Sequence, residues 1–203
     1  MKDWNKLANK EEVEKIIKNL KPRGISAFFV ETSKEAKEKV LELLLKNSRV
    51  LTAQSQTLNQ IGVVDEIDNS GNYISVRNEL MSLDREKEAS KIRVLRSTPD
   101  YMVGSINTIT KQGESLIVSN TGSQLVAYAG GAGKVIWVVG VQKIVDNLDE
   151  GFKRVYDYVL PLESERLKKL YGVPSNVSKL LIIDKEVDPS RVIIIFVNES
   201  LGF

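Results

Sequence analysis

The stretch SLIVSNTGSQLVAYAGGAGKVIWVVGVQKIV, residues 115–145, decides the expected fold. An apolar run at 116–118 leads into a polar turn at 119–123, and the glycines at 130–131 precede a second apolar run at 135–139. The order of strand, turn, short helix, glycine stop and strand is that of a βαβ unit.

Helical and strand patterns alternate along most of the remaining chain. Apolar residues recur at helical spacing in 11–20, after Ser33 and in 147–159, and a charged helix is expected over about 78–96. Pro161 is expected to separate the third of these helices from a further helical piece that ends at Tyr171. The expected strands are 25–30, 49–53, 73–76, 101–106, 114–118, 135–139, 180–183 and 192–197.

Most of these strands lack two-residue alternation, as is typical of strands that helices cover on both faces. We therefore expect an α/β protein with three layers, α/β/α, around a mostly parallel central sheet. Only a turn separates the last two strands, which suggests that the sheet is mixed. Residues 1–203 are expected to form one domain, with a helical segment at 1–24.

Two absences limit the chemistry. The chain of 203 residues has no cysteine and no histidine. It therefore holds no disulfide, no thiolate zinc site, no iron–sulfur cluster and no serine–histidine–aspartate triad. Catalysis would depend on carboxylates, lysine, tyrosine, backbone donors or a bound cofactor, and the sequence leaves the cofactor unknown.

Charge and hydropathy bear on the partners and the location. The net charge is +2, and no basic stripe is interleaved with aromatic residues, so nucleic acid is not an expected partner. The N-terminus, MKDWNKLANKEEVEK, lacks the apolar core of a signal peptide, and no apolar run is long enough to span a bilayer. A cytoplasmic location without membrane insertion is expected.

Four polar clusters follow expected strands, at 54–57, 107–110, 120–123 and 142–143. Ligands of open α/β sheets bind at the carboxyl ends of strands, so these clusters are candidate ligand-binding segments. In the third cluster, free N–H groups of Gly122 and Ser123 at a helix N-terminus would suit an anion, although the same residues also serve as ordinary caps and turns. The candidate ligand-binding residues are Ser55, Thr57, Asn107, Thr110, Asn120, Thr121, Gly122, Ser123 and Lys143.

Two charged residues are candidates for catalysis, Glu114 and Lys143. Glu114 is the carboxylate nearest the glycine turn in sequence, and Lys143 comes just after a strand, where its ammonium would neutralise an anion. The structural alternatives are a solvated loop glutamate and a lysine that extends its ammonium to solvent. The chain contains neither GxGxxG nor GxxxxGK[ST], so no dinucleotide fingerprint and no P-loop is present.

The clusters, in this order, resemble the LUD (lactate-utilisation) domain family, in particular its short single-domain members. The matching segments are SQTLNQIG (55–62), SINTIT (105–110), QGESLIVSNTGSQLVA (112–127), VIWVVGVQKIV (135–145), the segment from Pro161 to Leu167, and VNESLGF (197–203). The resemblance implies a fold similar to those of ribose-5-phosphate isomerase, CoA transferases and 5-formyltetrahydrofolate cyclo-ligase. It also implies a link to the oxidation of L-lactate to pyruvate, in a system with iron–sulfur partner proteins.

The chain departs from that family in two places. Many short members have a cysteine cluster after the segment that matches 161–170, whereas this chain reads KLYGVPSN there. The loop after the second strand, often glycine-rich in relatives, is AQSQ at 53–56. An iron–sulfur role is therefore lost in this chain.

Three functions agree with these features. The first is a LUD-type protein without a redox centre that binds a phosphate- or carboxylate-bearing small molecule in lactate or organic-acid metabolism. The second is a transferase, isomerase or cyclo-ligase that uses Glu114 or Lys143, and the third is a non-catalytic subunit of a complex. The apolar C-terminus ending in Leu201 and Phe203 is consistent with a homodimer, and equally with a tail that folds onto its own domain.

Overall fold

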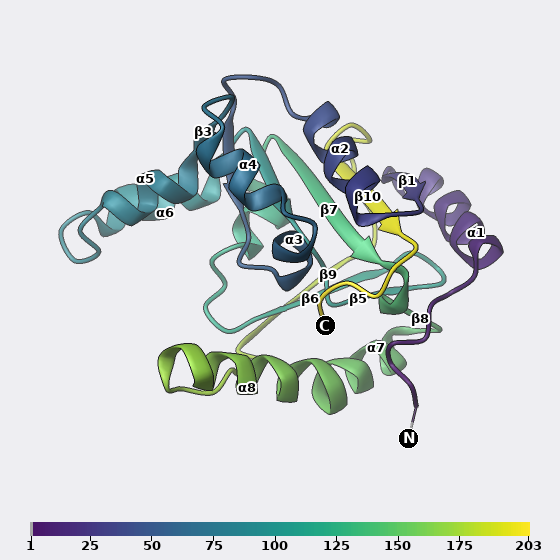
Figure 1. Ribbon diagram of the computed structural model, residues 1–203. Coiled ribbons are helices and arrows are strands. Elements are labelled where there is room, and N and C mark those ends of the chain that lie inside the picture. The colour runs from purple at the N-terminus through teal and green to yellow at the C-terminus, as the bar shows by residue number, and fades with distance from the viewer. Residues whose placement is uncertain (1) are drawn as a thin grey trace.

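The computed structural model describes residues 2–203, which fold around a six-stranded parallel sheet (Figure 1). The expected α/β class with a mostly parallel central sheet is confirmed. Every residue of β10 is buried, and β7 is buried except at its first residue, which explains why these strands show no alternation. In sheet order the strands are β1 (Ser26–Val30), β10 (Val192–Val197), β7 (Lys134–Gly140), β4 (Tyr101–Gly104), β2 (Arg49–Thr52) and β3 (Ile74–Ser75).

Three helices cover one face of this main sheet: α2 (Ser33–Leu43), α3 (Gln56–Gln60) and α4 (Val63–Asn69). The Thr32 side chain accepts from the Glu35 N–H, and the Glu35 carboxylate accepts from the Thr32 N–H, so both hydrogen bonds of a capping box are present at the start of α2. The apolar side chains of the three helices pack on the alternate residues Ile136 and Val138 of β7.

A second, smaller sheet covers much of the opposite face, together with α1 (Lys10–Leu20), which the short helix η1 (Lys21–Arg23) follows directly. Its strands, in order, are β8 (Ile144–Val145), β5 (Thr108–Thr110), β6 (Ser115–Ser119) and β9 (Lys179–Ile183). β6 pairs antiparallel with both β5 and β9. The antiparallel pairs of the molecule therefore lie in this second sheet, and the closing strands β9 and β10 belong to different sheets.

The expected βαβ unit at 115–145 is wrong, because β6 belongs to the small sheet and β7 to the main sheet. The connection between them contains only a short helical stretch that ends in a π-helical turn, η2 (Ala127–Gly131). Gly130 has φ 168°, outside the helical region, and a side chain on Gly131 would collide with the Ser97 carbonyl. The glycines thus stop the helix early, and the chain crosses from one sheet to the other.

One continuous helical segment packs outside the small sheet. It consists of α7 (Leu148–Arg154), a π-helical turn η4 (Val155–Val159) and α8 (Leu160–Tyr171). The expected break at Pro161 is wrong, because the helix widens just before it: the Leu160 N–H bonds to the Val155 carbonyl, five residues back. Proline then occupies a position near the start of α8, where its missing N–H costs little.

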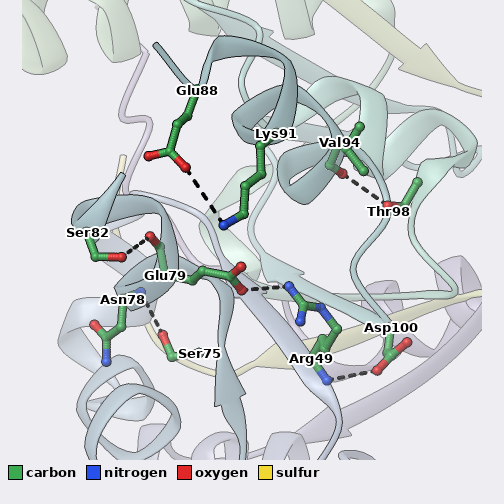
Figure 2. Close-up of polar contacts among 10 residues, drawn as sticks. All are labelled: Arg49, Ser75, Asn78, Glu79, Ser82, Glu88, Lys91, Val94, Thr98 and Asp100. Carbon is green, nitrogen blue, oxygen red and sulfur yellow. Dashed lines mark hydrogen bonds and ion pairs between the residues drawn. The ribbon is translucent and has the colours of Figure 1, made fainter. Parts of the chain in front are cut away.

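The single helix expected over 78–96 is two helices, α5 (Val76–Ser82) and α6 (Ala89–Ser97), which project from the body as a hairpin (Figure 1). The Asp84 side chain accepts hydrogen bonds from the N–H groups of Glu86 and Lys87 and so forms the turn between them. Arg49 of β2 fixes the base of this hairpin, as Figure 2 shows. Its guanidinium lies 2.7 Å from Glu79 and its backbone N–H donates to Asp100.

Among residues 2–203, none of the helices combines the length and the apolar character that a bilayer crossing requires.

Candidate functional site

Segments that follow four neighbouring strands of the main sheet meet at one edge of that sheet. Thr57 comes after β2, Ser105 after β4, Lys143 after β7 and Leu201 after β10, and hydrogen bonds connect the four. Ligands of open α/β sheets bind at the carboxyl ends of strands, so this edge is the candidate site. We call it the Lys143 edge; it consists of Thr57, Ser105, Lys143 and Leu201 and the side chains around them. The sequence clusters at 54–57 and 142–143 are therefore brought together.

The ammonium of Lys143 is the centre of this edge. Its Nζ lies 3.0 Å from Thr57 Oγ1, 3.0 Å from Ser105 Oγ and 3.2 Å from the Ile106 carbonyl oxygen. The Thr57 hydroxyl donates its own proton to the Leu201 carbonyl, and the Ser105 hydroxyl donates to a carbonyl of β7. Both hydroxyl oxygens therefore accept from Lys143, and three acceptors match the three donors of a charged ammonium.

Lys143 is only 3% exposed. Burial holds its pKa well below the ordinary value, and the positive charge of Arg154 lowers this pKa further. Among the side chains of residues 2–203, no carboxylate hydrogen-bonds or ion-pairs with Lys143. The three acceptors favour the charged amine, whereas burial and Arg154 favour the neutral one, so the protonation state depends on what else binds nearby.

Arg154 is a functional candidate that the sequence reasoning missed. It is fully buried at the end of α7, and its Nη1 donates to the Asn107 carbonyl at 2.8 Å. Burial lowers the pKa of Arg154 to about 10, so the guanidinium stays charged at neutral pH. Its position in the sequence was the signal that could have identified it. Arg154 falls on the same helical stripe as Gly151, Val155 and Val159, and the structure buries all of them.

The C-terminal segment 198–203 covers the Lys143 edge. The Leu201 carbonyl accepts hydrogen bonds from Thr57 and from Gln142 Nε2, the latter at 2.8 Å, and the Leu201 side chain is 4% exposed. Gly202 has φ +65°, and a side chain on it would lie 2.5 Å from Thr57 Oγ1 and 3.4 Å from Lys143 Nζ. The tail therefore folds onto its own domain, as one of the two sequence interpretations expected.

The turn at 120–123 has a different structure from the expected anion cradle. The Gly122 N–H donates to Ser119 Oγ at 2.9 Å, and the Ser123 N–H points to Thr121 Oγ1 at 3.4 Å. The helical stretch that follows is too short to give a strong helix dipole. The expectation of free N–H groups at a helix N-terminus is therefore wrong, because side chains of the turn itself accept from both groups.

Two further candidates take part in structural contacts outside the Lys143 edge. Ser55 caps α3, with its Oγ 3.5 Å from the Leu58 N–H. Asn120 Oδ1 accepts a hydrogen bond from the Ser178 hydroxyl at 3.2 Å, next to the start of β9.

Glu114 and Thr110 lie together in the hairpin turn between β5 and β6. The Thr110 hydroxyl donates to the Glu114 carboxylate and accepts from the backbone N–H groups of Gly113 and Glu114. Within residues 2–203, no hydrogen bond or ion pair connects Thr110 or Glu114 with Lys143, whose ammonium contacts Thr57, Ser105 and Ile106. Glu114 and Lys143, the two catalytic candidates, are therefore not brought together.

Within residues 2–203, no three acidic side chains gather closely enough to hold a metal ion. The chemical groups at the Lys143 edge are two cations, two hydroxyls and backbone carbonyls. Such an arrangement can hold an anion or, through the amine, accept a proton.

A comparison with a solved structure supports this fold. A crystal structure of a DUF162 family protein from Deinococcus radiodurans matches with a TM-score of 0.57 and 13% identity, over 95% of this chain and all of the other. The β subunit of eIF2B from Chaetomium thermophilum matches with a TM-score of 0.38 and 11% identity, over 57% of this chain and 43% of the other. Ribose 5-phosphate isomerase from Plasmodium falciparum matches with a TM-score of 0.34 and 14% identity, over 64% and 66%.

A comparison with curated protein sequences finds no match. A family model of the LUD domain, in contrast, matches residues 13–197, which include both sheets and all of the residues around Lys143 except the C-terminal cover. The chain therefore belongs to the LUD domain family.

Proposed function

We propose that this protein binds a small carboxylate- or phosphate-bearing molecule at the Lys143 edge, in the service of lactate or related organic-acid metabolism. The observation that carries the proposal is a pair of buried cations, Lys143 and Arg154, neither of which is paired with a carboxylate in residues 2–203. The metabolic context rests on the family. Since the chain has no cysteine, electron transfer in such a pathway would fall to iron–sulfur partner proteins.

The energetic argument concerns the cost of burying charge. An ion that leaves water without a counter-ion costs several kcal/mol even after the protein relaxes. Proteins usually pair such groups, or the groups lose their charge. An anion between Lys143 and Arg154 would restore the balance and keep Lys143 protonated, which is the state that its three acceptors require.

The test is thermal unfolding of the full chain with increasing L-lactate, ribose 5-phosphate, ATP or CoA. A ligand at about one hundred times its Kd raises the free energy of unfolding by about 2.7 kcal/mol. For a chain of this size, that corresponds to a rise in Tm of roughly 5–10 °C. Lys143→Met should abolish the response, whereas Lys169→Met, which removes an exposed lysine of α8, should keep it. A wild-type Tm that none of the four compounds changes would contradict the proposal.

A second candidate function is an enzyme of the transferase, isomerase or cyclo-ligase type in which Lys143 is the base or nucleophile. The lowered pKa of Lys143 favours it, because a lower pKa increases the fraction of the neutral amine, which is the reactive form. Turnover should then be lost in Lys143→Met and retained in Glu114→Gln, since the Glu114 carboxylate bonds to Thr110 in the turn between β5 and β6. Turnover that survives Lys143→Met would exclude this mechanism.

A further inference from the structure

The guanidinium of Arg154 has one side bonded to protein and one side without a partner. Nη1 donates to the Asn107 carbonyl, whereas neither Nε nor Nη2 has a hydrogen-bond partner among the residues that the structure describes. Both unpartnered atoms are fully buried. Leaving buried charged donors unpaired costs more than leaving neutral ones unpaired, so this side of the guanidinium points to a ligand.

We propose that Arg154 recognises the oxyanion group of the ligand and binds it through Nε and Nη2. These two N–H groups lie on one edge of the planar guanidinium and point in parallel, at the spacing of the two oxygens of a carboxylate or of a phosphate. A neutral carbonyl or amide offers one oxygen and fills only half of this edge. The inference rests on the proposed function and extends it, because it names the chemical group and the residue that reads it.

The orientation of this edge is fixed from three sides. Asn107, whose carbonyl holds Nη1, is itself fixed in the small sheet: its Oδ1 accepts from the Val118 N–H and its N–H donates to the Leu116 carbonyl. The Tyr158 ring lies 5.3 Å from the guanidinium carbon. The π-helical turn η4 begins directly after Arg154 and so sets the direction in which the residue leaves the helix.

A third unpartnered polar atom lies nearby on the small sheet. Thr108 Oγ1 is buried without a partner in the described chain, and a side chain on Gly151 would approach it to 2.9 Å. Gly151 is three residues before Arg154 on α7, which is one helical turn. The absence of a side chain at Gly151 therefore leaves this hydroxyl facing the same helix, one turn from the guanidinium.

Tyr158, whose ring lies beside the Arg154 guanidinium, also faces a surface cavity. Tyr158 is partly exposed, and it lines a cavity of about 730 Å³ between the segment 2–5 and α7. Its hydroxyl donates to Asn5 at 2.8 Å, and the Ser200 hydroxyl of the C-terminal cover donates to the same Asn5 oxygen at 3.2 Å.

The experiment uses the full chain labelled with ¹⁵N-arginine and follows the Nε–Hε signal of Arg154, assigned by its loss in Arg154→Lys. Inorganic phosphate, acetate and the neutral isostere acetamide are added separately. We expect phosphate or acetate to shift the signal and acetamide to leave it unchanged, and the response to the first two shows which oxyanion the site prefers. Arg154→Lys keeps the charge and loses the parallel edge, so it should weaken binding of the effective anion at least about tenfold.

Lys153→Gln is the matched control, because it removes one exposed positive charge from the adjacent position of the same helix. It should change the affinity by less than about twofold, as expected for a screened surface charge. An Arg154 signal that stays fixed while an anion still stabilises the protein through Lys143 would overturn the inference and leave the proposed function intact. If no anion stabilises the wild type and no arginine signal moves, both are wrong.

Discussion

At the scale of single residues, the properties of the site depend on the pKa of Lys143 in the folded state. Because burial and Arg154 lower its pKa in the folded state, the unfolded chain binds this proton more tightly than the folded chain does. The free energy of unfolding therefore rises with pH between the lowered pKa and the ordinary value of 10.5. Below the lowered pKa, the full cost of burying the charge is present.

Lys143→Met removes this titration while keeping a side chain of similar length. We expect the free energy of unfolding of the variant, relative to that of wild type, to be highest at the lowest pH measured. This difference should shrink as the pH rises from the lowered pKa of Lys143 toward its ordinary value of 10.5. Urea unfolding of both proteins at pH 7, 8, 9 and 10 without added anion measures it. A difference that is constant over this range would mean that the two states bind the Lys143 proton equally.

At the scale of elements, the C-terminal segment acts as a cover with its own anchor. Leu201 is buried against α3, β7 and β10, so Leu201→Ala should cost roughly 2–5 kcal/mol of global stability or, if the segment detaches alone, expose Lys143. Labelling of lysine amines followed by mass spectrometry distinguishes these outcomes. We expect faster modification of Lys143 in the variant, with Lys169 as the internal reference; equal rates for Lys143 in both proteins would show that the segment does not shield it.

The elements also show what the sequence could and could not predict. The strands around 135–139 and 192–197 and the helices at 11–20 and after Ser33 were predictable, because each has a local signal, an apolar run or a capped apolar stripe. The second sheet was not, since an apolar run such as that at 116–118 does not specify its pairing partner. The helical segment from α7 to α8 continues past Pro161 because of a π-helical turn, and no local sequence pattern predicts such a turn.

The candidate site was predictable only in part for the same reason. Thr57 and Lys143 each follow a strand, and the parallel sheet brings strand ends together. Arg154 comes from a helix outside the second sheet, and its proximity to Lys143 depends on how the two sheets pack. The hairpin role of Glu114 and Thr110 likewise depends on the antiparallel pairing of β5 with β6.

At the scale of the whole molecule, the main sheet joins two apolar cores. Ile136 of β7 packs in the core under α2, α3 and α4, whereas Ile194 of β10 packs in the core shared with α1 and the small sheet. The two residues face opposite sides of strands that pair directly. Since both cores include residues of the same two strands, neither core can lose its packing without disturbing the other.

We therefore predict that the chain unfolds as one cooperative unit. Ile136→Val and Ile194→Val remove the same methylene group from opposite faces of the sheet, and each should cost roughly 0.5–1.5 kcal/mol. Both should lower the midpoint of one and the same urea transition without changing its slope, because the slope reports the total surface exposed. The transition is followed by tryptophan fluorescence, to which the buried Trp137 and the partly buried Trp4 contribute, and by far-UV circular dichroism, which reports on all helices. If the two signals separate, or if each substitution shifts a different phase, the cores unfold independently and the sheet does not couple them.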